Sequence, residues 1–223
     1  MRKKLQFRYL ISFVLLIFLL CFFIVWNINA GSIDISLKEV FDILFCRNGQ
    51  ETAYNIVWEI RMPRILAAVI LGGALSVSGF LLQTFFGNPI AGPFVLGISS
   101  GAKLVVALVM IYLLGKSMVA TSGIMIIAAF AGSMISMGFV LAVAKKIRQM
   151  SMLVICGIMI GYICSAVTDF VVTFADDSNI VNLHNWSLGS FSGTSWDNVK
   201  VMTIVVVPVL IITFLMSKPI GAY

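Results

Sequence analysis

The sequence predicts an all-α fold, a polytopic membrane helical bundle of about six transmembrane helices with one short external re-entrant helix. Composition is the first reason, because 61% of the 223 residues are hydrophobic and 11% are charged, against about 25% charged in an ordinary soluble domain. A soluble chain of this length could not keep that much apolar surface from water. The second reason is that the basic residues cluster beside uncharged runs long enough to cross a bilayer. This clustering argues against nucleic-acid binding, although the formal net charge is +6.

The first predicted span covers about residues 9–28 and follows a basic amino terminus. Its apolar run is longer than the core of a secretory signal peptide, and residues 27–30 make a poor cleavage site. We therefore expect a retained helix whose amino terminus lies in the cytoplasm.

The segment from residue 32 to residue 60 is predicted to lie outside the membrane. Ser36 followed by Glu39 is the capping-box pattern of a helix start. Apolar residues then recur at helical spacing, at Leu37, Val40, Phe41 and Leu44. This pattern predicts a short amphipathic helix on the outer surface, with a plain connecting loop as the alternative.

A helical hairpin is predicted next, from spans at about residues 65–86 and 94–114. No charged side chain occurs between Arg64 and Lys103, and that run is too long for one crossing of a bilayer. Glycines and prolines between residues 87 and 93 interrupt it with turn-forming sequence.

Three more spans are predicted at about residues 118–144, 152–175 and 201–217. With the amino terminus inside, six crossings place the basic residues that follow the fourth and sixth spans inside as well. Lys116 and the acidic pair Asp176 and Asp177 then fall outside. The charge bias and the number of spans therefore agree.

Small residues recur four apart in several spans, which predicts close helix packing. These ladders are Ala68-Gly72-Ser76, Gly97-Gly101, Ala128-Gly132-Ser136 and Gly157-Gly161-Ser165. Residues 176–200 are a different case, because two tryptophans there bracket a Gly/Ser-rich stretch outside the spans. A short re-entrant helix around residues 183–188 fits that segment, and an irregular external loop is the alternative.

No enzyme site or metal site is expected. The four cysteines show no metal or disulfide spacing, and no cofactor-binding motif is complete. Residues 97–101 match Gly-x-Ser-x-Gly, but they open an apolar helix and lack the strand and the acid–histidine partners of a hydrolase. An intramembrane serine hydrolase is kept as an alternative that a fluorophosphonate probe would test.

Several separated motifs resemble the signature of the FecCD-type permeases, over about the first two-thirds of that family. The residues that carry the resemblance are Arg61-x-Pro63-Arg64, Gly79, Gln83, Asn88-Pro89, Pro93, Gly97-Ile98-Ser99, Gly101-Ala102, Trp186-x-x-Gly189-Ser190 and Trp196. These permeases are the membrane subunits of bacterial type II ABC importers for iron-siderophores, haem and cobalamin.

The resemblance implies a permease subunit that moves an iron(III)-siderophore into the cytoplasm, with cobalamin or haem as the alternative substrate. It implies a second permease subunit in a homodimer or heterodimer, a cytoplasmic ABC ATPase that hydrolyses the ATP, and an extracytoplasmic substrate-binding protein. It also implies the bacterial inner membrane as the location. The sequence does not identify the chelate, because such importers take much of their specificity from the binding protein.

The resemblance also nominates site residues. Arg61 and Arg64 match the arginines that dock the binding protein, and anchoring to lipid headgroups is the alternative reading of both. The residues nominated for the translocation pathway are Gln83, Asn88, Ser99, Lys103, Thr168, Asp169, Asn185, Ser187 and Ser190. Lys103 departs from the family pattern and either snorkels to the interface or faces the pathway. The one histidine, His184, could meet a metal chelate but is more often structural or exposed.

Members of the family have about ten helices, so the chain is expected to be truncated at its carboxyl terminus. It could be the first part of a permease, a truncated product, or a chain whose partner carries the rest. A non-transporting membrane scaffold is therefore the alternative function from another class.

Overall fold

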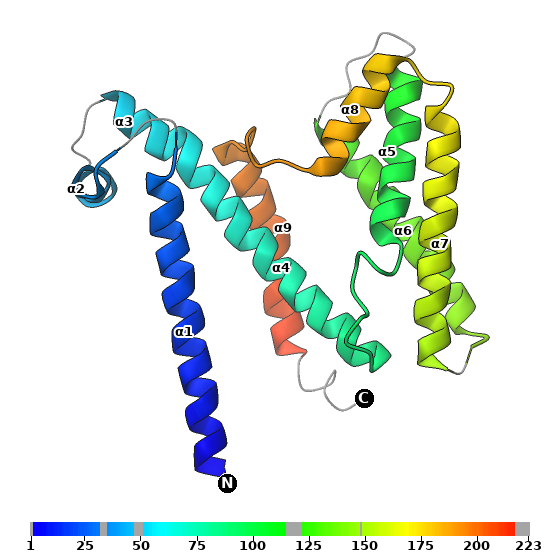
Figure 1. Cartoon of the computed structure of the whole chain (residues 1–223), viewed down its shortest axis with the longest axis horizontal. Helices are drawn as coiled ribbons and strands as arrows, with labels where there is room; N and C mark the ends of the chain where they lie inside the picture. Colours follow the sequence, from blue (N-terminus) through cyan, green and yellow to red (C-terminus); the bar gives the residue numbers. More distant parts are fainter. Residues whose placement is uncertain (1, 32–34, 47–50, 115–121, 148, 217–223) are drawn as a thin grey trace. The chain divides into compact units, whose positions relative to one another are not determined.

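The computed structural model describes residues 2–31, 35–46, 51–114, 122–147 and 149–216, and within these residues it is helical with no strand. The predicted all-α fold is therefore confirmed. The helices are α1 (Arg2–Asn29), α2 (Leu37–Phe41), the π-helical turn η1 (Asp42–Cys46), α3 (Glu51–Asn55), the π-helical turn η2 (Ile56–Arg61), α4 (Met62–Phe86), α5 (Ile98–Leu114), α6 (Ser122–Ala144), α7 (Met150–Val172), α8 (Asp177–Leu188) and α9 (Trp196–Leu215), as Figure 1 shows.

Within the described residues, five helices are long and apolar enough to cross a membrane. They contain α1, α4, α6, α7 and α9, and α5 is a shorter apolar helix of 17 residues. In chain order these six helices lie at the positions of the six predicted spans, and the crossing of the membrane by each stays a prediction. Residues 118–121 and 217, which belong to predicted spans, lie outside the described residues.

The ends of several helices differ from the predicted ends. The α5 helix begins at Ile98 rather than near residue 94, because the preceding residues form turns and Gly97 has a φ of +73°. A left-handed φ of this kind is easy for glycine and ends a helical run. The α9 helix begins at Trp196 rather than near residue 201, because the Ser195 hydroxyl caps it by accepting from the Asn198 amide at 3.5 Å.

The chain divides into two compact units, and we describe each by itself. The first unit contains residues Met1–Gly72 and Phe191–Tyr223. Its apolar core brings together the carboxyl-terminal end of α1, the short helices and the start of α4. The buried members of this core are Ile28, Ile35, Val40, Ile43, Ala53, Val57 and Ile65. The apolar window of α1 has no buried residue, as suits a helix that faces lipid.

The predicted Ser36 cap in the first unit is confirmed. The Ser36 hydroxyl accepts a hydrogen bond from the Glu39 amide at 3.2 Å, and α2 begins at the next residue. The start of α9 is attached to the same unit through two tryptophans. The Trp196 indole stacks on Trp58 with ring centroids 6.0 Å apart and donates to the Trp58 carbonyl oxygen at 2.8 Å.

The second unit, Gly73–Ser190, is organised around α5, which packs against α6, α7 and α8. Three of the predicted small-residue ladders meet there. A Cβ atom on Gly101 would lie 2.7 Å from the carbonyl oxygen of Gly132, and one on Gly97 would lie 2.7 Å from the amide nitrogen of Gly161. Close packing is therefore confirmed for these ladders. For the ladder on α4, a Cβ on Gly72 would meet no described atom within 4 Å.

The predicted helix between the fifth and sixth spans is present and longer than expected. It is α8, which begins at Asp177 instead of near residue 183 and ends where Gly189 adopts a φ of +72°. Leu183 and Trp186 hold it against the apolar cluster at the carboxyl-terminal end of α5. An irregular loop is therefore wrong for residues 177–188.

Candidate functional site

The two arginines of the Arg-x-Pro-Arg motif lie one turn apart in the first unit and have different surroundings. Arg61 ends η2 and is only 8% exposed. Its Nη1 donates to the carbonyl oxygen of Ile28, and to that of Asn29 at 3.5 Å. The last carbonyls of a helix have no partner within the helix and carry partial negative charge. Arg61 therefore ties the end of α1 to the start of α4.

Gly31 makes room for this arrangement. A Cβ atom at position 31 would lie 2.9 Å from the Arg61 Cζ atom, and the other guanidinium atoms are also close. A side chain at this position would therefore push the guanidinium away from the end of α1.

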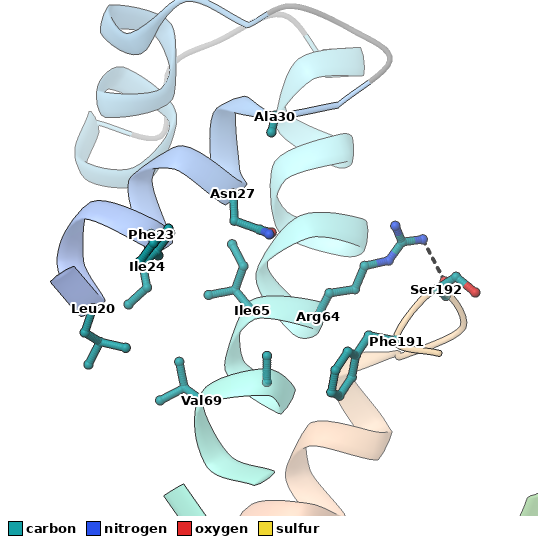
Figure 2. Close-up of a pocket in the computed structure, with 11 residues that line it drawn as sticks. Leu20, Phe23, Ile24, Asn27, Ala30, Arg64, Ile65, Val69, Phe191 and Ser192 are labelled. Carbon is teal, nitrogen blue, oxygen red and sulfur yellow. Dashed lines mark hydrogen bonds between the residues drawn. The ribbon is translucent and has the colours of Figure 1, made fainter. Parts of the chain in front are cut away.

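Arg64 lies in the first turn of α4 and is half-buried. Its Nη2 donates to the carbonyl oxygen of Ser192 at 2.7 Å, as Figure 2 shows. Its Nε atom is buried and has no hydrogen-bond partner. Among the described residues, no carboxylate forms an ion pair with Arg64.

A cavity of about 530 Å³ lies beside Arg64 in the same unit (Figure 2). Residues from α1, α4 and the segment before α9 line it. They are Leu20, Phe23, Ile24, Asn27, Ala30, Arg64, Ile65, Ala68, Val69, Phe191 and Ser192. We call this cavity the α1–α4 pocket. Most of its lining is apolar, with polar groups contributed by Asn27, Arg64 and Ser192.

The nominated pathway residues all lie in the second unit but do not form one site. Gln83 is exposed near the end of α4, and Asn88 lies in the turn that follows. The Asn88 Oδ1 accepts from the Ile90 amide at 2.9 Å, so this side chain also stabilises the turn. Ser99 is exposed and Lys103 half-buried in the first turns of α5.

The other pathway residues lie near the opposite end of α7. Leu153 and Val154, at the start of α7, share an apolar cluster with Phe86, beside the Asn88 turn. Thr168 and Asp169 come about four turns later, or about 21 Å along the helix.

The nominated residues near the carboxyl-terminal end of α7 and on α8 differ in how deeply they are buried. Thr168 is 1% exposed and its hydroxyl donates to the Cys164 carbonyl at 2.8 Å, whereas Asp169 is exposed. Asn185, Ser187 and Ser190 are exposed on or just after α8, and His184 is exposed beside them. The exposed side chains of Asp169, His184 and Asn185 can be reached by a partner or a solute. The Ser187 hydroxyl already donates to the His184 carbonyl oxygen at 2.8 Å, and the Thr168 hydroxyl is buried.

Sequence reasoning missed the α1–α4 pocket and the pairing of Arg64 with Ser192. Asn27 gave a weak signal, because it is a polar residue near the end of an apolar run. Nothing local marks Ser192, which lies 128 residues from Arg64 in the chain. Among the described residues, no group of three His, Cys, Asp or Glu side chains is placed to hold a metal ion.

Comparison with known proteins identifies the family. A sequence model of the FecCD transport family matches residues 17–223. The chain belongs to the FecCD transport family. The resemblance predicted from the motifs is confirmed, and the description is that of transport proteins rather than enzymes. The several apolar helices agree with a multi-pass membrane protein of this family.

Curated relatives in the FecCD family include two vitamin B12 import system permease proteins named BtuC. The one from Klebsiella pneumoniae is 36% identical over 165 residues, covering 74% of this chain and 49% of that protein. The one from Vibrio parahaemolyticus is 37% identical over 167 residues, with the same two coverages. The chain thus spans about half the length of the curated relatives it matches.

A solved structure supports the FecCD-type fold. It is an ABC transporter assigned to the metal-chelate type, in an inward-facing conformation. The TM-score is 0.76 at 20% sequence identity, and the match covers 92% of this chain and 61% of that chain. At this identity the likeness shows the fold alone, and it agrees with the predicted bundle of a type II importer permease.

Proposed function

We propose that this chain forms the membrane-spanning part of an ABC importer that moves a metal chelate into the cytoplasm. The observation that carries the proposal is the FecCD family match across residues 17–223. The apolar helices supply the crossings that such a permease needs.

The proposed partners follow from the family. A second permease subunit, identical or different, completes the pathway, and a cytoplasmic ABC ATPase on a separate chain hydrolyses ATP. An extracytoplasmic binding protein delivers the chelate. The assembly is placed in the bacterial inner membrane with the amino terminus of this chain in the cytoplasm, in keeping with the basic residues before the first span.

Two substrates are proposed, and both are large metal chelates. The sequence resemblance favours an iron(III)-siderophore. The names of the curated relatives favour cobalamin, because these proteins are vitamin B12 import permeases. Uptake by cells that lack the gene for this chain distinguishes the two substrates.

The decisive assay compares uptake of radiolabelled cobalamin and of a radiolabelled iron(III)-siderophore in the deletion strain and its parent. Loss of only one uptake activity, restored by the intact gene, identifies that chelate. Normal uptake of both chelates in the deletion strain contradicts the metal-chelate proposal.

We propose that the end of the first unit that carries the arginines docks the binding protein. Arg64 supports this role, because it is half-buried, positively charged and without a carboxylate partner among the described residues. Arg61 donates to the end of α1, so its share in docking stays a prediction. Electrostatic complementarity of this kind acts mainly on the rate and specificity of association.

For the translocation pathway, we propose that the exposed polar groups near α8 contribute to its wall. Asp169, Asn185 and Ser187 support this role, because each is an exposed polar residue on α7 or α8. The α5 helix, against which both α7 and α8 pack, is largely apolar. Polar groups in such positions usually face water or a partner helix. The pathway roles of Gln83, Asn88, Ser99, Lys103, Thr168 and Ser190 stay predictions.

A further inference from the structure

The α1–α4 pocket is amphipathic along its depth. Its polar residues lie where the apolar spans end, since Arg64 is the last charge before the uncharged run of α4 and Asn27 is near the end of α1. Its apolar residues lie deeper. Leu20 precedes Asn27 by about two turns of α1, and Val69 follows Arg64 by more than one turn of α4, so the apolar part is about 8–10 Å deep.

The two helices that form the walls of the pocket, α1 and α4, are joined where α1 ends and α4 begins. Arg61 donates to the carbonyl oxygens at the end of α1, so the end of α1 and the start of α4 lie together. From this junction, α1 followed back from Asn27 and α4 followed forward from Arg64 both run toward the apolar part of the pocket. Figure 2 shows Arg64 and Ser192 at one end of the pocket and Leu20 and Val69 away from them.

Arg64 offers the pocket a hydrogen-bond donor that the protein does not satisfy. Its Nη2 is bonded to Ser192, but the buried Nε–H has no partner. An unpaired buried donor is costly, and a guanidinium is always charged and suited to phosphate or carboxylate. The described residues supply no carboxylate for Arg64, so an anion from outside the described residues can take the place of the missing partner.

The apolar lining decides what kind of anion fits. A small soluble anion would satisfy Arg64 and leave the deeper walls uncovered, whereas an amphiphile satisfies both parts. Phe23, on the α1 wall, is 61% exposed, and the apolar window of α1 has no buried residue. The bilayer can therefore supply the occupant from the side of α1.

We propose that the α1–α4 pocket binds one phospholipid. Its phosphate accepts a hydrogen bond from the Arg64 Nε–H at the level of the headgroups. The upper part of one acyl chain lies between α1 and α4, against Phe23, Ile24 and Val69. A guanidinium at the headgroup level can pair with a lipid phosphate through charge-assisted hydrogen bonds. The bound lipid would then fill the gap between two helices that otherwise contact each other mainly at their outer ends.

The test counts phospholipids that stay bound to the full chain, extracted in mild detergent together with its native assembly and without substrate or binding protein. Native mass spectrometry and lipid extraction give the number per chain after extended detergent washing. We expect about one retained phospholipid per chain in the wild type. Retention of no phospholipid, or of detergent alone in the pocket, overturns the proposal.

Two variants act on different parts of the site. Arg64→Gln removes the charged donor, and Ala68→Trp fills the apolar part of the pocket while keeping the arginine. Each should lower the retained phospholipid at least about fivefold, because each removes one of the two required features. The matched controls are Lys145→Gln and Ala142→Trp, which change exposed residues of the other unit and should keep the wild-type value.

Every result with these variants bears on the proposal. Retained lipid in Ala68→Trp places the lipid elsewhere, and equal loss in the controls means that the lipid is not specific to the pocket. Recovery of a free fatty acid or a binding-protein segment in place of a phospholipid also contradicts the proposal. Circular dichroism and a monodisperse elution profile establish that each variant is folded.

A wild-type measurement covers the case in which a variant fails to fold. A phospholipid with a photoreactive group near the top of its acyl chain is incorporated into the membrane and activated by light. Proteolysis and mass spectrometry should then place the label on residues 20–27 or 64–69. Labelling only outside those residues overturns the proposal. Because none of these assays measures transport, their outcome is independent of the proposed import function.

Discussion

Arg61 and Arg64 have the same charge and lie one turn apart, yet their surroundings give them different tasks. The Arg61 guanidinium is directed to backbone carbonyls at the end of α1, where it stabilises a junction between helices. The Arg64 guanidinium uses one nitrogen for Ser192 and leaves another buried and unpaired. The sequence motif alone could not separate these tasks, because the difference arises from contacts with distant residues.

The first prediction concerns Arg61. Arg61→Met keeps an unbranched, flexible side chain but removes the guanidinium, so the carbonyl oxygen of the buried Ile28 loses this donor. We expect the free energy of unfolding to fall by about 1–3 kcal/mol, because a buried polar group loses its partner. Thermal unfolding in detergent, followed by circular dichroism, measures the change.

The control for Arg61 is Lys200→Gln. Lys200 forms an ion pair with Asp197 at 3.0 Å, but both side chains are largely exposed. Exposed pairs contribute little to stability, so this variant should unfold at the wild-type temperature. Equal unfolding temperatures for Arg61→Met and the wild type would show that the junction does not depend on Arg61.

The second prediction concerns docking at Arg64. Arg64→Glu reverses the charge and should weaken association with the binding protein, mainly through a slower association rate. The difference from wild type should shrink as salt is added, because added ions screen the charges. Surface plasmon resonance with the assembly in nanodiscs at several salt concentrations provides the measurement.

Lys145→Glu is the matched control for docking, because Lys145 is exposed at the end of α6 in the other unit. Its association rate should equal that of the wild type. An unchanged rate for Arg64→Glu would remove Arg64 from the docking surface, whatever its effect on bound lipid.

At the scale of the elements, glycines determine how closely α5 approaches α6 and α7. Gly101 and Gly132 face each other so closely that a Cβ on either would meet backbone atoms of the other. Without a hydrophobic drive between helices in lipid, such close contact provides much of the packing energy. The small-residue spacing predicted this contact from the sequence, although it did not say which helices would meet.

The third prediction compares two glycines of the same helix. Gly132→Ala should destabilise the protein by about 1–3 kcal/mol, because the new methyl group overpacks the crossing of α5 and α6. Gly138→Ala is the control, since a Cβ at position 138 would meet no described atom within 4 Å. It should be neutral or slightly stabilising, because alanine favours a helix more than glycine does. Thermal unfolding compares the two variants, and equal losses of stability would contradict the packing account.

Local sequence patterns predicted some elements well and others only in part. The Ser36 cap was readable because its partner, Glu39, lies three residues away. The start of α5 was misplaced by about one turn, because the φ of Gly97 depends on its packing against Gly157 and Gly161 in another helix. The α1–α4 pocket could not be foreseen, since its walls come from three distant parts of the chain.

At the scale of the whole molecule, the predicted membrane topology can be tested through the two ends of α7. Gln149 lies just before α7 and is exposed, and Ser187 is exposed on α8, which follows it. The charge pattern predicts that Gln149 lies on the cytoplasmic side and Ser187 on the outer side.

The fourth prediction uses cysteine labelling in a background from which the four native cysteines have been removed. A membrane-impermeant thiol reagent added to intact cells should label Ser187→Cys. It should label Gln149→Cys only after the membrane is permeabilised, because that residue is expected inside. The reverse pattern would invert the topology, and with it the proposed positions of the ATPase and the binding protein.

The attachment of α1 near one end has a consequence for the bilayer. The helix is 28 residues long, or about 42 Å, whereas the hydrocarbon core of a bilayer is about 30 Å thick. The basic first turns, Arg2 to Arg8, extend into the headgroups, and any remaining hydrophobic excess is relieved by tilting. Because Arg61 holds the carboxyl-terminal end of α1, a thinner membrane would displace the amino-terminal end most. A thinner membrane should therefore increase the tilt of this helix, within the limits set by its junction with the start of α4.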